Sequence, residues 1–439
     1  MKLTGNETLT TACPKIVSVH TLSPWYMLKY RIPIFRSPFR TYPIIKHLNP
    51  PEISMVNTRA NAYTWSHISS VSKGTASAHE SLNDRRRRWA QLLHHQHYQP
   101  LITEVLEEEL PKYQHSTVIK AADMAENMRE CALILASASP ILTAAVGGNL
   151  VARILQEPDL QDTYKTIFER GHHQPSIYAH FLTDRYGVPP TPNQYLIIRD
   201  MVRDYLIQNE SSENSWQIDN ITPPLVTRRA SNRGHRKYLH TSDRSSKRVE
   251  TLQRFCAGAQ ARWLETPAQL RDTPFSYPPA ECGYSKASHI RLAQHRARQS
   301  SNYVMNLVED ICTYLHRTAI FEQHFSMHAF IIYLIFRPSQ AALAEIFCSG
   351  LLQVWVEGGG GFNAYPAGRS VATARRVSEG EWAGHERYVR LESLVVLNMR
   401  EQQRKADQWR EALNWEQKRA GDEDVEKGGR EEGAEADCM

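Results

Sequence analysis

One apolar stretch restricts the folds open to this chain more than any other feature. The sequence FIIYLIF (330–336) is a continuous apolar run of strand length, and AALAEIFCSGLLQVW (341–355) follows it at helical length. We therefore expect a buried strand followed by a buried helix. Glu345 is the single carboxylate in the second segment. A carboxylate on a buried helix costs free energy unless it is paired or bound to a cation, so Glu345 is a candidate metal ligand.

A second group of polar residues precedes this stretch, in CGYSKASHIRLAQHRARQSSN (282–302). Gly283 indicates a tight turn, and Arg291 and His295 stand four residues apart, on one face of the helix expected there. Together with Glu345 they supply a cation, a titratable base and a carboxylate. Phosphodiester hydrolysis needs such a set, because a phosphate must be held, a proton taken from water and a hard divalent cation bound.

In this order and spacing the residues resemble the GIY-YIG endonuclease domain, a small α/β unit with a short sheet flanked by helices. Gly283, Arg291 and His295 keep the offsets of eight and four residues found in that family. Glu345 matches its metal-binding Glu, and Asn363 in GGGGFNAYPAG matches an Asn near the end of the domain. The resemblance implies that Glu345 binds Mg²⁺, that Arg291 holds a phosphate oxygen and that His295 acts as base or orienter.

The chain departs from this family at both signature tyrosines. Gly-Ile-Tyr, expected shortly before the second strand, is not recognisable in TPFSYPPAECGY (273–284), and the Tyr of the second tripeptide falls on Glu281. Tyr284 or Tyr277 is expected to position water in their place. The four glycines at 358–361 precede no Gly-Lys-Ser/Thr, so we expect them to let the chain turn sharply and present Asn363.

Charge is unevenly placed along the chain. Residues 228–254 hold nine Lys or Arg against two acidic residues, and the tail 421–439 holds eight acidic against two basic residues. A basic segment directly before the nuclease-like region favours a polyanionic partner, and a solvated linker is the alternative. The candidate nucleic-acid-binding residues are Arg228, Arg229, Arg233, Arg236 and Lys237.

Hydrophobic periodicity and composition predict an α+β protein: an N-terminal all-helical domain, then a small α/β domain with a short sheet flanked by helices, and a C-terminal helix. The predicted regions are an irregular lead-in (1–82), the helical domain (83–208), a basic linker (209–250), the GIY-YIG-like domain (251–370, with the resemblance itself over about 265–370), a charged helix (371–420) and an acidic disordered tail (421–439).

Composition narrows the cellular setting. The mean hydropathy of -0.50 argues against an integral membrane protein. The apolar run 131–155 is diluted by polar residues, and we expect a buried helical hairpin broken near Pro140 or Gly147. Seven cysteines without CxxC spacing indicate a reducing compartment. We expect an intracellular protein, of the nucleus or cytoplasm; seven basic residues against one acidic residue in 1–50 leave the mitochondrion open.

Two functions from different classes fit these features. The first is a divalent-metal-dependent endonuclease acting on nucleic-acid phosphodiesters, with DNA favoured over RNA as the partner. The second is a catalytically inactive GIY-YIG-like module that binds nucleic acid or another protein. The retained Arg, His, Glu and Asn favour the enzyme, while the missing tyrosines favour the binding module. The predicted helical domain is expected to have a protein partner in either case.

Overall fold

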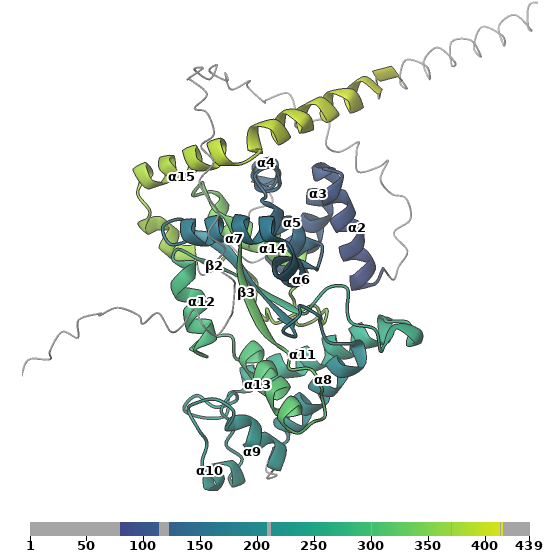
Figure 1. The fold of residues 1–439 in the computed structure, drawn as a ribbon, viewed down its shortest axis with the longest axis vertical. Coiled ribbons are helices and arrows are strands. Elements are labelled where there is room, and N and C mark those ends of the chain that lie inside the picture. Colours follow the sequence, from purple (N-terminus) through teal and green to yellow (C-terminus); the bar gives the residue numbers. More distant parts are fainter. Residues whose placement is uncertain are drawn as a thin grey trace, which may run out of the picture. The chain divides into compact units, whose positions relative to one another are not determined.

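The computed structural model describes residues 80–113, 123–208, 212–299, 301–369, 371–412 and 414–415. All but the end of the predicted lead-in, the basic residues within 1–50 and the acidic tail lie outside this range. Within it the chain has an α+β fold, as its sequence predicts: helices surround a small sheet (Figure 1).

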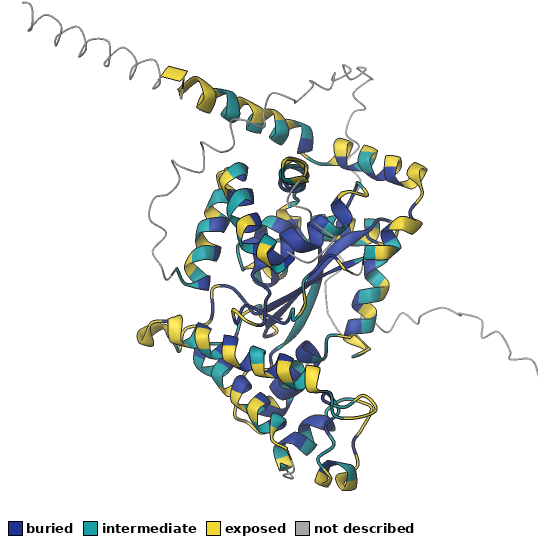
Figure 2. Cartoon of the chain, turned by 180° about the vertical axis from the view of Figure 1, so that it is seen from behind, coloured by how far each residue is buried: buried dark blue, intermediate teal, exposed yellow. Residues whose placement is uncertain are grey.

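The sheet has three antiparallel strands in the order β2-β1-β3. They are β1 (Ser176–Thr183), β2 (Ala280–Ser285) and β3 (Ser326–Leu334). The central strand β1 is buried at all eight positions, and Figure 2 shows the sheet within the molecule while the helices expose their outer faces. β1 lies within the region predicted to be all-helical, so that prediction was wrong at this point. The predicted helical and α/β regions share one sheet.

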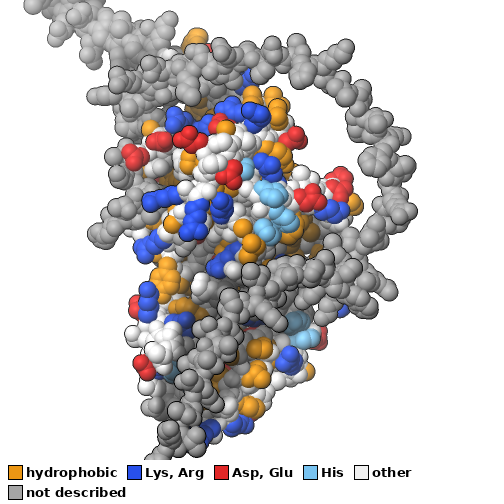
Figure 3. Space-filling view, turned by 90° about the vertical axis from the view of Figure 1, so that its left-hand side faces the viewer, with side chains coloured by type: hydrophobic (Ala, Val, Ile, Leu, Met, Phe, Trp, Pro, Cys, Tyr) orange, Lys and Arg blue, Asp and Glu red, His pale blue; other side chains and the backbone are white. Residues whose placement is uncertain are grey.

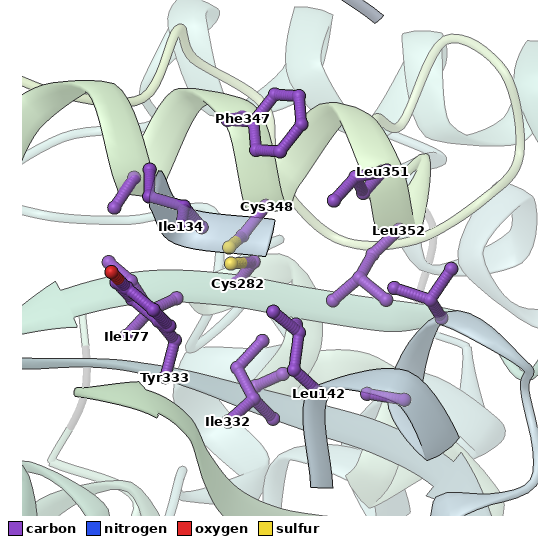
Figure 4. Close-up of a cluster of buried hydrophobic side chains, with 14 of the residues drawn as sticks. Ile134, Leu142, Ile177, Cys282, Ile332, Tyr333, Phe347, Cys348, Leu351 and Leu352 are labelled. Atoms are coloured by element: carbon purple, nitrogen blue, oxygen red, sulfur yellow. The ribbon is translucent and has the colours of Figure 1, made fainter. Parts of the chain in front are cut away.

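One hydrophobic core joins the sheet to helices from both predicted domains. In Figure 4, Phe347 and Cys348 of α14 lie over β2 and its neighbours, with Ile134 of α4 and Leu142 of α5 beside them. Cys348 lies against Cys282 of β2. The helices that build this core are α2 (Leu82–His94), α3 (Tyr98–Glu109), α4 (Met124–Ala136), α5 (Pro140–Val146), α6 (Leu150–Gln156), α7 (Pro158–Arg170) and α14 (Gln340–Leu352).

A second hydrophobic core is mainly helical, and most of it lies in the insertion between β1 and β2. The insertion leaves and returns at one point, because the Leu182 amide donates to the Pro279 carbonyl at 2.9 Å. Thr191 and Gln194 form a reciprocal cap at the start of its first helix, with Pro192 in the first turn. Its helices are α8 (Pro192–Leu206), α9 (Glu213–Asp219), α10 (Arg228–Asn232) and α11 (Ser246–Glu265); α13 (Tyr303–Arg317) packs against them.

The predicted basic linker is therefore a folded part of this second core. Tyr238 and Leu239 are buried there, and the Lys237 ammonium lies 3.1 Å from Oδ2 of Asp310, which is fully buried in α13. Tyr238 and Thr222 also donate to that oxygen, at 2.5 and 2.9 Å. The linker prediction was wrong because polar composition alone does not reveal a partner 73 residues further along the chain.

The order strand, helix, helix, strand, helix predicted for residues 282–363 is confirmed. β2 is followed by α12 (Ser288–Arg296), α13, β3 and α14. The C-terminal helical region is also present, as α15 (Glu379–Glu392), which begins at a reciprocal cap of Ser378 and Glu381, and a further helical stretch at 395–412. Short 3₁₀ turns lie at Leu110–Tyr113, Ala268–Leu270 and Val371–Arg376.

The apolar run 131–155 forms the ends of a helical hairpin that breaks just before Pro140. Its helices α4 and α5 are bent by 107° and pack into the first core. Among the described residues no single helix is long and apolar enough to cross a membrane; this bent pair alone meets the criterion, by length and composition only.

We predict that Lys237→Ala lowers the free energy of unfolding by about 3 kcal/mol, because it leaves the Asp310 carboxylate buried without its cation. Urea unfolding followed by far-UV circular dichroism would measure the loss. Arg233→Ala, which removes an exposed cation from the same segment, should change the free energy by less than about 0.5 kcal/mol. Equal, small effects of both substitutions would return the segment to a linker.

Candidate active site

The register between β1 and β2 brings polar side chains together on one face of the sheet. Tyr178 lies opposite Gly283, and His180 lies opposite Glu281. Because side chains alternate along a strand, all of these positions share a face, and α12 lies against this face through His295. A Cβ on Gly283 would lie 2.5 Å from the Tyr178 hydroxyl oxygen. The missing side chain therefore lets the phenol ring lie across β2.

Tyr178 contacts the first residue of the predicted site. Nε of Arg291 donates to the Tyr178 hydroxyl at 3.3 Å, and the terminal nitrogens of Arg291 donate to Gln294 and Ser301, each at 3.4 Å. The side chain is half-buried, and within the described residues no carboxylate forms an ion pair with it. A guanidinium held by neutral partners in this way can still take an anion such as phosphate.

His295 lies one helical turn after Arg291 and is buried beneath Tyr178. Its ring centre is 5.4 Å from that of Tyr178 and 4.4 Å from that of His180. Burial lowers the pKa of His295 to about 3, against the opposing effect of the Glu281 carboxylate. The imidazole is therefore neutral at physiological pH. It can accept a hydrogen bond or bind a metal, but it is a weak base.

Glu345 and Asn363 lie along the outer edge of β2, the edge that faces away from β1. Oε2 of Glu345 accepts from the Gly368 amide at 2.9 Å, and the Tyr284 amide also bonds to this carboxylate. The Asn363 side chain donates to the Cys282 carbonyl at 2.8 Å and accepts from its amide at 3.2 Å. Both polar groups of the Asn363 amide are thus used to extend the hydrogen bonding of β2.

Glu345 has the surroundings expected of a metal ligand. Burial raises its pKa to about 7, the charge of Glu281 adds to this, and no described cation pairs with it. A divalent cation would offset the cost of burying the ionised carboxylate, so the residue fits Mg²⁺. Its charge also raises the pKa of Tyr178, as do burial and Glu281. Glu345 therefore acts electrostatically on the tyrosine that Arg291 contacts.

The structure thus groups four of the five predicted catalytic residues around β2 and changes the expected role of two. Arg291 and His295 approach from α12, while Glu345 and Asn363 line the strand edge. The group is more enclosed than the open cleft expected, because His295 and Glu345 are only 3% and 9% exposed. Asn363 fixes the backbone and has no free amide to offer a substrate. The glycines before it allow close packing, since a Cβ on Gly361 would lie 1.8 Å from the Ala280 carbonyl oxygen.

The tyrosines behave differently from the sequence prediction. Tyr284 points to the face of β2 opposite Tyr178, where its hydroxyl accepts from Thr373 at 3.5 Å. Tyr277 lies instead under the guanidinium of Arg86, 4.5 Å from its ring centre, away from the group. The residue that contacts Arg291 is Tyr178, which the sequence analysis missed together with His180. Its signal is the tripeptide Ser-Ile-Tyr at 176–178.

The five basic candidates divide into two groups. Arg236 is fully buried and donates to the carbonyl of His235 at 3.0 Å, and Lys237 pairs with Asp310, so neither is available as a surface contact and their prediction was wrong. Arg229 and Arg233 are exposed. Arg228 is exposed too, although it pairs with Glu213 and stacks over Trp216 at 4.1 Å. Figure 3 shows further Lys, Arg and His side chains gathered on the side of the molecule where α12 lies in Figure 1.

Comparisons of the chain with models of known protein families, with curated proteins and with solved structures found no match. The argument about function therefore rests on the residues and their geometry.

The raised pKa of Glu345 predicts a pH-dependent stability in the presence of a chelator. Between its ordinary pKa near 4.5 and about 7, the folded chain holds this proton while the unfolded chain releases it, so the free energy of unfolding falls as pH rises. Glu345→Gln should remove that fall, so its advantage over the wild type should grow by up to about 3 kcal/mol from pH 5 to pH 8. Urea unfolding at both pH values tests this, and a constant difference would contradict it.

Proposed function

We propose that this chain is a divalent-metal-dependent endonuclease that acts on nucleic-acid phosphodiesters through a GIY-YIG-like site. The observation that carries the proposal is the hydrogen bond between Arg291 and Tyr178 across Gly283, with the buried carboxylate of Glu345 beside them. A phosphate-binding cation, a hydroxyl and a metal-grade carboxylate meet there, from three different elements of the fold.

The position of Tyr178 supports the resemblance noted in the sequence. Ser176-Ile177-Tyr178 lies on the strand paired with β2, where the first tripeptide of the family would be expected. Residues 184–279 separate it from β2, which is why the sequence next to β2 lacks it. One departure remains, because Glu281 occupies the place of the second tyrosine.

The side chains divide the work of hydrolysis as follows. Arg291 would hold a non-bridging oxygen of the phosphate, and Glu345 would hold Mg²⁺, which supplies charge stabilisation to the phosphate and leaving oxygen when bound. The pKa of Tyr178 lies far above its usual value, because of burial and the charge of Glu281, so its hydroxyl stays protonated and orients water by hydrogen bonding. Asn363 keeps the edge of β2 in place for Glu345.

Basic side chains on the side where α12 lies favour a nucleic-acid substrate. Arg296 of α12 is exposed next to the half-buried Arg291, and Figure 3 shows other cations on this side. Cations near a phosphate-binding site raise the local concentration of a polyanion. We propose DNA ahead of RNA as the partner; nicking assays on both would decide between them.

We predict that Glu345→Ala lowers Mg²⁺-dependent nicking by ~10³-fold or more, because it removes the protein ligand of the cation. Folding should survive, since the substitution removes a buried carboxylate whose ionisation is costly. The assay is cleavage of branched, single-stranded and duplex substrates by purified protein, with circular dichroism as the check on folding. Glu107→Ala, on the exposed side of α3, is the matched control and should leave the rate unchanged.

Two further variants separate the roles within the site. Arg291→Ala should lower the rate by roughly 10- to 100-fold through loss of the phosphate contact, and Tyr178→Phe should lower it while keeping the ring that packs over Gly283. If the wild type binds nucleic acid but cleaves none with any divalent cation, the inactive binding module is the correct function. Glu345→Ala would then change the affinity little.

The exposed part of the basic segment gives a separate prediction on binding. Arg228, Arg229 and Arg233 replaced together by Ala should weaken nucleic-acid binding and reduce the dependence of log affinity on log salt by up to about three phosphate contacts. Fluorescence anisotropy over a range of salt concentrations measures both quantities. An unchanged affinity and slope would show that these side chains are solvated and do not contact the polyanion.

A further inference from the structure

A cluster of three buried side chains lies next to the proposed site and has no role in it. His180 of β1, Glu281 of β2 and His295 of α12 each offer one donor atom, and these atoms all lie within 4.8 Å of one another. The side chains are 2%, 6% and 3% exposed. Three separate elements of the fold, distant in sequence, thus direct imidazole and carboxylate groups at one point.

The hydrogen bonding of this cluster is incomplete. Nδ1 of His180 bonds to Oε2 of Glu281 at 2.8 Å, which leaves Nε2 of His180 without a partner among the described residues. Neither ring nitrogen of His295 has a hydrogen-bond partner there. Unpaired polar atoms at this depth cost free energy, so their retention in three facing side chains needs an explanation.

We infer that His180, Glu281 and His295 bind one first-row transition-metal ion of the Zn²⁺ class. Two imidazoles and a carboxylate are the donors that such ions prefer, whereas Mg²⁺ prefers oxygen ligands alone. Ligands around one ion lie within about 4.2 Å of one another, since each bond is near 2.1 Å. The three side chains therefore need to close by only about half an ångström.

This site is distinct from the one proposed for Mg²⁺, and it holds whether or not the chain cleaves nucleic acid. An ion here would tie α12 to both β1 and β2, directly beneath Tyr178, whose ring centre lies 5.6 Å from that of His180. It would also offset the charge of Glu281, which bears on Tyr178. The ion would thus position Tyr178 and α12, without itself contacting the substrate.

The test is direct metal binding by the full chain after treatment with a chelator. Titration with Zn²⁺ alone, followed by calorimetry, should give one ion per chain at micromolar affinity or tighter, and Co²⁺ should give visible absorption bands of a nitrogen- and oxygen-ligated ion. Glu281→Gln, which keeps the hydrogen bond to His180, and His295→Gln should each weaken Zn²⁺ binding by at least about 10-fold. Bound Zn²⁺ should raise the melting temperature of the wild type and not of these variants.

Controls distinguish this site from the surface and from the proposed Mg²⁺ site. His172 and His289, whose rings lie 4.2 Å apart at the surface, are the other close pair on this side, and their joint replacement by Gln should leave Zn²⁺ binding intact. Glu345→Ala should also leave it intact, even where it abolishes nicking. The inference fails if the wild type binds no stoichiometric Zn²⁺ or Co²⁺, or if binding is lost with the surface pair and kept in Glu281→Gln and His295→Gln.

Discussion

The pairing of β1 with both of its neighbours is the interaction on which the rest of this structure depends. β1 is the central strand, it is fully buried, and its partners come from segments a hundred or more residues away. Its register sets the site, because Tyr178 must lie opposite Gly283 and His180 opposite Glu281. A shift of one residue would turn both side chains away from α12 and place Ile177 and Ala179 there instead.

The insertion between β1 and β2 explains how such distant strands can pair. It begins and ends at one point, where the Leu182 amide meets the Pro279 carbonyl, so it takes the place of a hairpin turn. The entropy of closing a loop grows only slowly with its length, and this insertion stabilises itself through its own core. That core also takes in Leu182 of β1 and Phe362, which precedes Asn363. The insertion and the edge of β2 therefore stabilise one another.

The sequence predicted the part of the fold in which the pattern is local. The helix offsets of Arg291 and His295 and the apolar run before Glu345 depend on neighbouring residues, and the order of elements from β2 to α14 was right. β1 was missed because eight residues buried on both faces show no alternation, and they lie between helical segments. The burial of Lys237 was missed for the same physical reason, since Asp310 is far away in sequence. Non-local pairing leaves no signal in a periodicity.

Glu281 shows how the two levels of this site are connected. In the position where the family would have a tyrosine, the chain places a buried carboxylate, whose pKa is lowered by His180, His295 and Arg291 against the opposing effect of burial. The same charge raises the pKa of both Tyr178 and Glu345. Glu281 is therefore costly to the residues that would act on substrate, unless a cation compensates it. Two neutral imidazoles facing that carboxylate cannot do so by themselves, and a bound metal ion can.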